Sequence, residues 1–466
     1  MSLIKELLVE NQPQKAIGEA IKKAHESQEK LNAVVTFVDE YEEIKPGKLS
    51  GIPIVLKDNV STKGIRTTAS SRILENYVPV YDATIVEKLH EAGAVIIAKA
   101  SMDELAMGGT NLSAATGPVH NPYDINRIPG GSSGGSAALV AAGVVPMAIG
   151  SDTGDSIRKP ASFCGIVGVK PTYGKISRYG IIPYASSLDH VGYFTRSVSD
   201  AALALEVLQG YDPKDMTSAH DEEQAYSELL NSDLTGKKIL VFKDVMDSLS
   251  NQNITASFEH LIEKMQAKGA IIRDVSFDAK VLKTILPAYY LIANCEATAN
   301  HSNLDGLRFG MQEEADSMEE IMIASRTKGL GANIRARFVM GSFGLFDENQ
   351  EKMLKKAQRV RRVIVDMINA ELSQADILIA PAASVVAPLI NGQSNSELSD
   401  EYLIADNHMV IGNFAGLPSM TLPLGYEEGL PFGVNITANA FSEQVMFNVA
   451  LAIEEITGIK DAKVEC

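Results

Sequence analysis

The stretch that most constrains the fold runs from Pro129 to Pro160 and reads PGGSSGGSAALVAAGVVPMAIGSDTGDSIRKP. Two clusters of small residues, 130–135 and 151–156, flank an apolar run with the composition of one helix followed by one short strand. A helix and a strand in this order bring both clusters to one end of a sheet. The clusters therefore mark a candidate site.

Glycines at this density allow close backbone approach and leave N–H groups that no side chain covers. A helix that opens at Ser156 to Arg158 would direct the amides of residues 153–156 toward an oxygen that becomes negative in a transition state. Glycine- and serine-rich tracts are often flexible loops instead. The apolar residues between the clusters favour a buried turn, and with it an oxyanion hole.

One short pattern offers a different chemistry. Residues 131–135 fit G-x-S-x-G, the nucleophile elbow of α/β-hydrolases, with Ser133 as the nucleophile. That elbow requires a buried strand directly before it, and the preceding residues 122–129, PYDINRIP, do not form one. Because the pattern also arises by chance in such sequence, we give it little weight.

Length and charge limit the class of protein. With 466 residues the chain can bury a large core in one or two domains. Its net charge of −17 opposes direct binding of phosphate backbones, which takes clustered lysine and arginine, so any nucleic acid should be held by another subunit. Its three cysteines lack metal-ligand spacing, and without a membrane-length apolar stretch we expect a cytoplasmic protein.

Helical and strand patterns alternate along the chain. Amphipathic helices are predicted over 3–31, 253–268, 348–373 and 441–456, and buried strands over 51–56, 94–98, 240–242, 377–380 and 420–424. This rhythm predicts an α/β fold with a mixed, mostly parallel central sheet covered by helices on both faces. We expect one domain over 1–466, with core motifs in 51–185, an insertion or boundary near 211–237, and a substrate-pocket half over 238–466.

A serine nucleophile needs a base, and Lys57 is the best candidate. None of the eight histidines lies in or beside the serine clusters. Lys57 ends an apolar strand, where burial would lower the pKa of its amine toward the range in which a neutral amine acts as base. A lysine whose ammonium reaches solvent, or one paired with Asp58 or Asp82, explains the same position equally well.

Several separate motifs, in this order, resemble the amidase signature family, and the similarity extends from about residue 3 to about residue 455. They are Gly51–Asn59 (GIPIVLKDN), Pro129–Ser136 (PGGSSGGS), Gly150–Arg158 (GSDTGDSIR), Phe163–Gly165 (FCG) and Gly168–Thr172 (GVKPT). The resemblance implies one large amidase-signature fold and a Ser-cisSer-Lys triad.

Residue by residue, the resemblance implies that Ser156 is the nucleophile that forms an acyl-enzyme. It implies that Ser132, held by a cis peptide bond, bridges Ser156 to the base, Lys57. The resemblance also implies that Ser133 and Arg158 make supporting hydrogen bonds. It implies that the backbone amides around Thr153, Gly154, Asp155 and Ser156 form the oxyanion hole.

Two positions in the second half bear on the substrate. Within the family the chain most resembles glutamine-hydrolysing subunits of tRNA-dependent amidotransferases, and the resemblance assigns the glutamine carboxylate to Arg361 and its ammonium to Asp406. An arginine can bind a carboxylate through two parallel hydrogen bonds, which suits a site for the glutamine carboxylate. Considered without the resemblance, Arg361 belongs to a solvated basic helix face and Asp406 to a helix surface.

The sequence departs from the family pattern at two positions. Asp155 stands where glycine is common, directly before the nucleophile, and Lys159 where glutamine is common. A carboxylate at position 155 would repel a developing oxyanion. Because the two residues lie four apart at a helix start, we hypothesise that they pair and that Lys159 cancels the added charge. An unchanged glutaminase rate of Lys159→Gln at every pH would count against this.

The resemblance also implies partners. A B subunit would use ATP and Mg²⁺, contact the tRNA and receive ammonia through a tunnel, and a small C subunit would complete a heterotrimer. No cofactor is expected in this chain. Two alternatives stay open: a stand-alone amidase that acts on another small amide, and a scaffold protein whose site Asp155 impairs.

Overall fold

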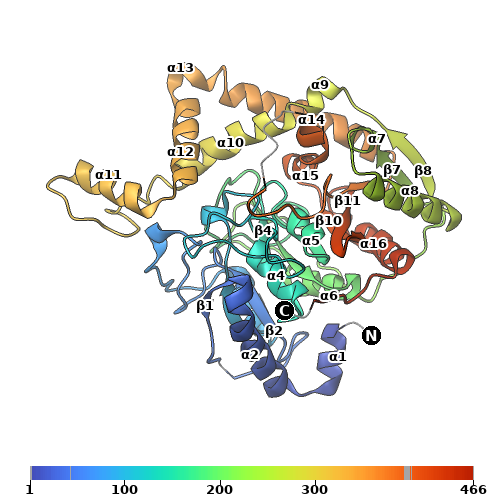
Figure 1. Ribbon diagram of the computed structural model, residues 1–466, viewed down its shortest axis with the longest axis horizontal. Helices are drawn as coiled ribbons and strands as arrows, with labels where there is room; N and C mark the ends of the chain where they lie inside the picture. The colour runs from blue at the N-terminus through green and yellow to red at the C-terminus, as the bar shows by residue number, and fades with distance from the viewer. Residues whose placement is uncertain (1–2, 42, 393–398, 400, 465–466) are drawn as a thin grey trace.

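The computed structural model describes residues 3–41, 43–392, 399 and 401–464. One twisted sheet of eleven strands runs through the middle of the molecule, in the order β1-β3-β2-β4-β6-β5-β10-β11-β9-β7-β8 (Figure 1). The strands are β1 (Val34–Phe37), β2 (Pro53–Lys57), β3 (Val95–Ala100), β4 (Met147–Asp152), β5 (Val167–Lys170), β6 (His190–Thr195), β7 (Lys238–Phe242), β8 (Ile271–Val275), β9 (Ile377–Pro381), β10 (Ser419–Glu427) and β11 (Leu430–Ala438).

Helices cover both faces of this sheet, as the sequence predicts. The first half of the chain carries α1 (Leu3–Glu10), α2 (Pro13–Leu31), α3 (Thr84–Glu91), α4 (Gly134–Ala141), α5 (Arg158–Phe163) and α6 (Val198–Leu208), with short 3₁₀ turns at Arg72–Leu74 and Glu104–Ala106. The second half carries α7 (Lys243–Asp247), α8 (Gln252–Ala267), α9 (Ala279–Leu282), α10 (Ile285–Asn300), α11 (Met318–Gly329), α12 (Ala332–Leu345), α13 (Asp347–Gln350), α14 (Leu354–Leu372), the π-helical turn η3 (Glu401–Ala405), α15 (Val410–Ala415) and α16 (Glu443–Thr457).

Alternating side chains of each strand pack on opposite layers. In β2, Ile54 and Leu56 join a core with α3, α6, α8 and α16, whereas Val55 faces α2 and α4. At the other end of the sheet, Leu240 and Leu378 pack under α10 and α14. Successive side chains of a strand point to opposite faces of the sheet. Because these strands are buried on both sides, they contribute to an apolar layer on each face.

The expectation of a mostly parallel sheet is wrong. Among the ten strand pairs in the described part of the chain, six are antiparallel and four are parallel. A parallel pair requires a long crossover, usually a helix. Strands β10 and β11 instead form a direct hairpin, and β6 enters between β4 and β5 in the antiparallel direction.

The domain division stays a prediction. The predicted insertion or boundary at 211–237 falls between α6 and β7. Strands from before and after it belong to the same sheet, since β5 pairs with β10.

The central parallel strands position the site. Strand β2 lies between β3 and β4 and runs parallel to both, so Lys57 and Ser151 come to the same edge of the sheet. Helix α4 is buried along its whole length and leads into β4. Its first residues, just after Ser132 and Ser133, therefore lie at this edge too.

Candidate active site

Lys57 lies at the centre of the site. Its side chain is fully buried, and its Nζ atom lies 2.8 Å from the Ser132 hydroxyl, 2.9 Å from the Ser133 hydroxyl and 2.9 Å from the Ser151 hydroxyl. An ammonium donates three hydrogen bonds, whereas a neutral amine donates two and accepts one. A neutral Lys57 can therefore accept a proton from one of these hydroxyls.

Burial favours this neutral form. Desolvation lowers the pKa of Lys57 to about 7, although the negative charges of Asp103, Asp152 and Asp189 act in the opposite direction. Lys57 is buried, so its ammonium does not reach solvent, and it pairs with neither Asp58 nor Asp82. Asp58 accepts hydrogen bonds from Thr68 and Ser70, and Asp82 accepts the Lys63 amide.

A tight glycine turn presents Ser132 to the amine. The Gly131–Ser132 peptide bond is cis. A Cβ atom at Gly131 would lie 2.1 Å from the Asp103 Oδ2 atom and 2.6 Å from the Thr110 amide nitrogen, so only glycine fits there. The Asp103 carboxylate accepts the amides of Thr110 and Asn111, and the Asp103 amide donates to the Ser132 carbonyl at 3.2 Å, which ties the turn to Asp103.

The turn of residues 153–156 contains the expected nucleophile. Ser156 is 4% exposed, and its carbonyl accepts the Ser133 amide at 3.2 Å, which joins the two serine turns. Within the described residues the Ser156 hydroxyl has no hydrogen-bond partner, so the link from Ser132 to Ser156 is not made in this structure. Catalytic hydrogen bonds often tighten only when substrate is bound.

The same turn offers free amides. Among the described residues, the backbone N–H groups of Gly154, Asp155 and Ser156 donate no hydrogen bond. The Thr153 hydroxyl donates to Asp189 at 2.7 Å and anchors the start of the turn. A buried turn with free N–H groups beside a serine can stabilise an oxyanion.

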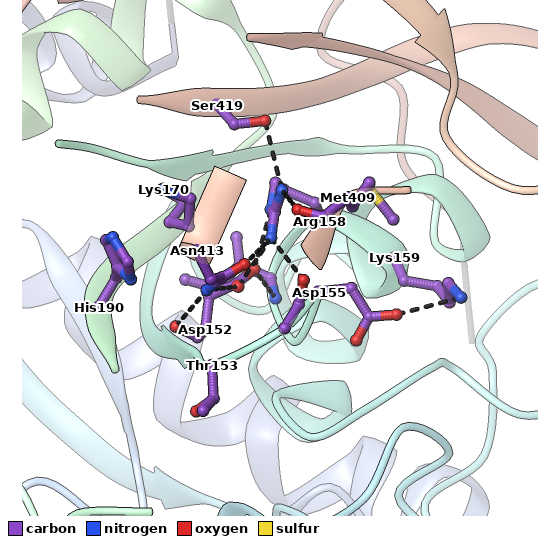
Figure 2. A network of polar contacts seen from close by, with 12 residues as sticks. Asp152, Thr153, Asp155, Arg158, Lys159, Lys170, His190, Met409, Asn413 and Ser419 are labelled. Atoms are coloured by element: carbon purple, nitrogen blue, oxygen red, sulfur yellow. Dashed lines mark hydrogen bonds and ion pairs between the residues drawn. The ribbon is translucent and has the colours of Figure 1, made fainter. Parts of the chain in front are cut away.

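A buried ion pair holds the end of the turn (Figure 2). Arg158 donates to both carboxylate oxygens of Asp152, at 2.9 and 3.1 Å, and to the Gly154 carbonyl at 2.7 Å. It also donates to Asn413 and to the Met409 carbonyl, which ties the turn to α15. Burial alone would raise the pKa of Asp152, but the Arg158 charge holds it well below its usual range.

A cavity of about 770 Å³ opens beside the nucleophile turn, where Gly154 and Asp155 form part of its wall. Its volume lies in the range of small-molecule sites. Its charged lining groups include Asp155, Lys159, Arg337 and Asp406. Apolar and aromatic lining residues include Phe163, Leu286, Tyr289, Tyr290, Tyr402 and Val410.

A family model and several known proteins match this chain. The family model "Amidase" matches residues 10–447. This chain belongs to the amidase family.

Curated relatives and a solved structure match the amidase over nearly its full length. It is 39% identical over 467 residues to the A subunit of glutamyl-tRNA(Gln) amidotransferase from Caldanaerobacter subterraneus subsp. tengcongensis, a match that covers 97% of this chain and 95% of the relative. The corresponding A subunit from Carboxydothermus hydrogenoformans is 43% identical over 419 residues, or 90% and 86% of the two chains. The crystal structure of the A subunit from Thermotoga maritima has a TM-score of 0.85 and 35% identity, and the match covers 100% of this chain and 98% of that one.

The structure does not bring Arg361 to the cavity with Asp406. Arg361 on α14 donates to the Phe414 carbonyl at 3.0 Å and to the Ser187 hydroxyl and carbonyl at 2.9 and 3.1 Å. These contacts join α14 to a loop and to α15. Arg361 is not among the residues that line the cavity, whereas Asp406 is. The convergence expected of these two residues is therefore absent.

Arg337 on α12 is the arginine that lines the cavity. Its guanidinium donates to the Tyr184 hydroxyl at 3.0 Å and lies 5.2 Å from the centre of the Tyr290 ring. Sequence reasoning missed it, because the segment 332–345 contains two arginines among apolar residues and no spacing distinguishes one of them. Only the packing of α12 against α10 selects Arg337.

Asp406 is held with its carboxylate at the cavity wall. Its Oδ1 atom accepts the Ser384 hydroxyl at 2.8 Å and the Ser384 amide at 3.2 Å. Asp406 and Arg337 thus place a carboxylate and a guanidinium on the wall of the same cavity.

The predicted pairing of Asp155 with Lys159 is present. Lys159 Nζ lies 3.0 Å from the Asp155 Oδ2 atom, one helical turn apart (Figure 2). Burial alone would lower the pKa of Lys159, but the carboxylates of Asp155 and Asp406 raise it. The lysine therefore stays charged beside Asp155.

His190 is buried, and desolvation holds its pKa well below the usual value; its Nδ1 atom contacts the Leu188 carbonyl at 2.6 Å. In the described part of the chain no group of three or more His, Cys, Asp or Glu side chains could hold a metal ion. No described helix is long and apolar enough to cross a bilayer.

Proposed function

We propose that this amidase is the glutaminase subunit of glutamyl-tRNA(Gln) amidotransferase. The observation that carries the proposal is the buried Lys57 amine, 2.8 Å from the Ser132 hydroxyl, in a molecule whose nucleophile turn lines a cavity that also contains the Asp406 carboxylate and the Arg337 guanidinium. The length over which the chain matches subunits of that enzyme supports the choice.

The reaction begins with proton transfer. Neutral Lys57 accepts the Ser132 proton while Ser132 accepts the proton of Ser156, and the Ser156 oxygen attacks the side-chain carboxamide carbon of glutamine. The carbonyl oxygen becomes negative and is stabilised by the free amides of residues 154–156. The same relay then returns the proton to the departing nitrogen, which leaves as ammonia.

A glutamyl ester on Ser156 remains. Water attacks its carbonyl carbon, Lys57 again accepts a proton through Ser132, and glutamate leaves as the Ser156 hydroxyl is restored. Ser133 and Ser151 keep the lysine oriented through both halves of the cycle. Arg158 positions the nucleophile turn through Asp152 and the Gly154 carbonyl.

Substrate recognition rests on opposite charges. Asp406 would bind the ammonium of glutamine and Arg337 its carboxylate, in place of Arg361, whose donors are occupied by Ser187 and Phe414. Charge-assisted hydrogen bonds of this kind are stronger than neutral ones.

The ammonia would pass to a B subunit that uses ATP and Mg²⁺ to activate glutamyl-tRNA(Gln) and that contacts the tRNA, with a C subunit completing a cytoplasmic heterotrimer. A chain with a net charge of −17 suits a role in which its partner holds the RNA. The chain itself would need no cofactor.

The test is ammonia release from glutamine by the purified chain, with and without co-expressed B and C subunits. We expect glutaminase activity that requires, or is strongly increased by, the partners. Partner-independent hydrolysis of other small amides, with glutamine left intact, would instead identify a stand-alone amidase.

A further inference from the structure

Lys159 joins the nucleophile turn to the far wall of the cavity. It is the second residue of α5, and its side chain is 15% exposed. Its Nζ atom lies 3.0 Å from the Asp155 carboxylate and donates to the Asp406 main-chain carbonyl at 2.6 Å. One ammonium thus contacts two residues that are far apart in the chain.

The first contact concerns the reaction itself. Asp155 directly precedes Ser156, and its side chain is 22% exposed at the cavity wall. An unpaired carboxylate there would repel the oxyanion that forms on the neighbouring amides. Figure 2 shows the Asp155 side chain directed toward Lys159, so the ammonium offsets the negative charge where it is closest to the turn.

The second contact concerns substrate binding. Three contacts hold Asp406: Ser384 donates to its carboxylate, Lys159 donates to its main-chain carbonyl, and its own amide donates to the Glu401 carbonyl at 3.0 Å. The segment that carries Asp406 follows the π-helical turn η3 and precedes α15, so no regular helix fixes it. The lysine therefore helps to fix the main chain that carries the Asp406 carboxylate.

We propose that Lys159 is a positioning and specificity-determining residue with two separable effects: it neutralises Asp155 for the chemical step and fixes Asp406 for recognition of the substrate ammonium. The proposal rests on the proposed function. It predicts that the two effects divide between kcat and KM, because each depends on a different contact.

Four variants separate the contacts. Lys159→Gln keeps a donor for the Asp406 carbonyl but loses the charge, so we expect kcat for glutamine to fall about 10-fold while KM changes less than about 3-fold. Lys159→Met loses both, and we expect the same fall in kcat with KM raised about 10-fold. In Asp155→Gly/Lys159→Gln the repulsive carboxylate is absent, and kcat should recover most of the loss seen in Lys159→Gln. Lys159→Arg keeps charge and donors and should stay close to wild type.

These rates are measured in the assembled enzyme, alongside thermal unfolding of each variant to show that it is folded. A double variant no faster than Lys159→Gln would overturn the role at Asp155. Equal KM values for Lys159→Gln and Lys159→Met would overturn the role at Asp406.

Failure of the proposed function gives a different result. If the wild-type enzyme does not hydrolyse glutamine but hydrolyses another small amide, the function is wrong and the same four variants are compared on that amide. The kcat effect at Asp155 is then still expected. The KM effect is expected only for an amide that carries an ammonium, and its presence on an uncharged amide would contradict the inference.

Discussion

At the scale of single residues, the chemistry depends on the protonation of one buried lysine. Desolvation lowers the pKa of Lys57 to about 7, so the fraction of neutral amine rises as the pH increases through that value. We therefore expect kcat/KM for glutamine to increase with pH up to about 7 and then level off, which a pH–rate profile measures.

Lys57→Arg tests the same step. A guanidinium stays protonated at any accessible pH, so it cannot accept the Ser132 proton. We expect kcat/KM to fall at least about 100-fold without recovery at high pH, the size of a general-base contribution. Turnover that survives this replacement would rule out the lysine as base.

Substitution distinguishes Arg337 from Arg361 as the residue that binds the glutamine carboxylate. Arg337→Met removes the guanidinium from the cavity, and we expect KM for glutamine to rise about 10- to 100-fold, the value of one charge-assisted bond. Arg335→Met, two positions earlier on the same helix and exposed, is the matched control and should leave KM unchanged. Arg361→Met should instead lower thermal stability, since Arg361 joins α14 to Ser187 and Phe414. A KM effect at Arg361 alone would restore the first expectation.

At the scale of elements, the sequence predicts several strands from their apolar runs and misses others. The expected strands at 51–56 and 94–98 correspond to β2 and β3, and that at 377–380 to β9. Strands β6 and β11 were not predicted, because the segments HVGYFT and LPFGVNITA contain glycine, proline and polar residues that weaken a strand pattern. Without β6 and β11, the sequence does not show that most neighbouring strands are antiparallel.

The residues of the site also divide into those that the sequence predicts and those that it misses. The family motifs place Lys57, Ser132 and Ser156, and the structure brings their turns to one sheet edge. The Asp155–Lys159 pair followed from a spacing of four residues at the start of a helix. Arg337 could not be found, because it reaches the cavity only through the packing of α12 on other helices, which no local pattern encodes.

The glycine turn before α4 should be sensitive to an added side chain. In Gly131→Ala the added methyl group would overlap the Asp103 carboxylate, which packs against the turn, so we expect a loss of roughly 1–3 kcal/mol in unfolding free energy and of most activity. Gly18→Ala is the control: nothing lies within 4 Å of its Cβ position, it is exposed in α2, and we expect a gain of roughly 0.5–1 kcal/mol. Thermal unfolding and glutaminase assays of both variants measure the contrast.

At the scale of the whole molecule, a buried carboxyl group couples stability to pH where the two ends of the chain meet the core. Glu454 on α16 accepts the Val198 amide, at the start of α6, at 2.7 Å. Burial raises the pKa of Glu454 to about 7, and the charges of Asp461 and Asp200 add to this, whereas Lys460 opposes it. Asp200 also accepts the Ile4 amide of α1, so α1, α6 and α16 share this region.

The sign of the effect follows from proton binding. In the unfolded chain Glu454 ionises near 4.5, whereas in the folded protein it holds its proton up to about pH 7. Between these values the folded state binds more protons, so stability falls as the pH rises through this window, by on the order of 1–3 kcal/mol.

Glu454→Gln removes this dependence while keeping an oxygen for the Val198 amide. We expect the variant to unfold about 1–3 °C above wild type at pH 8 and at nearly the same temperature at pH 4.5. The exposed neighbour provides the control, since Glu455→Gln should not change the difference between the two pH values. If the unfolding temperatures of Glu454→Gln and wild type change with pH in parallel between pH 4.5 and 8, the carboxyl group is already ionised in the folded protein and α16 tolerates its charge.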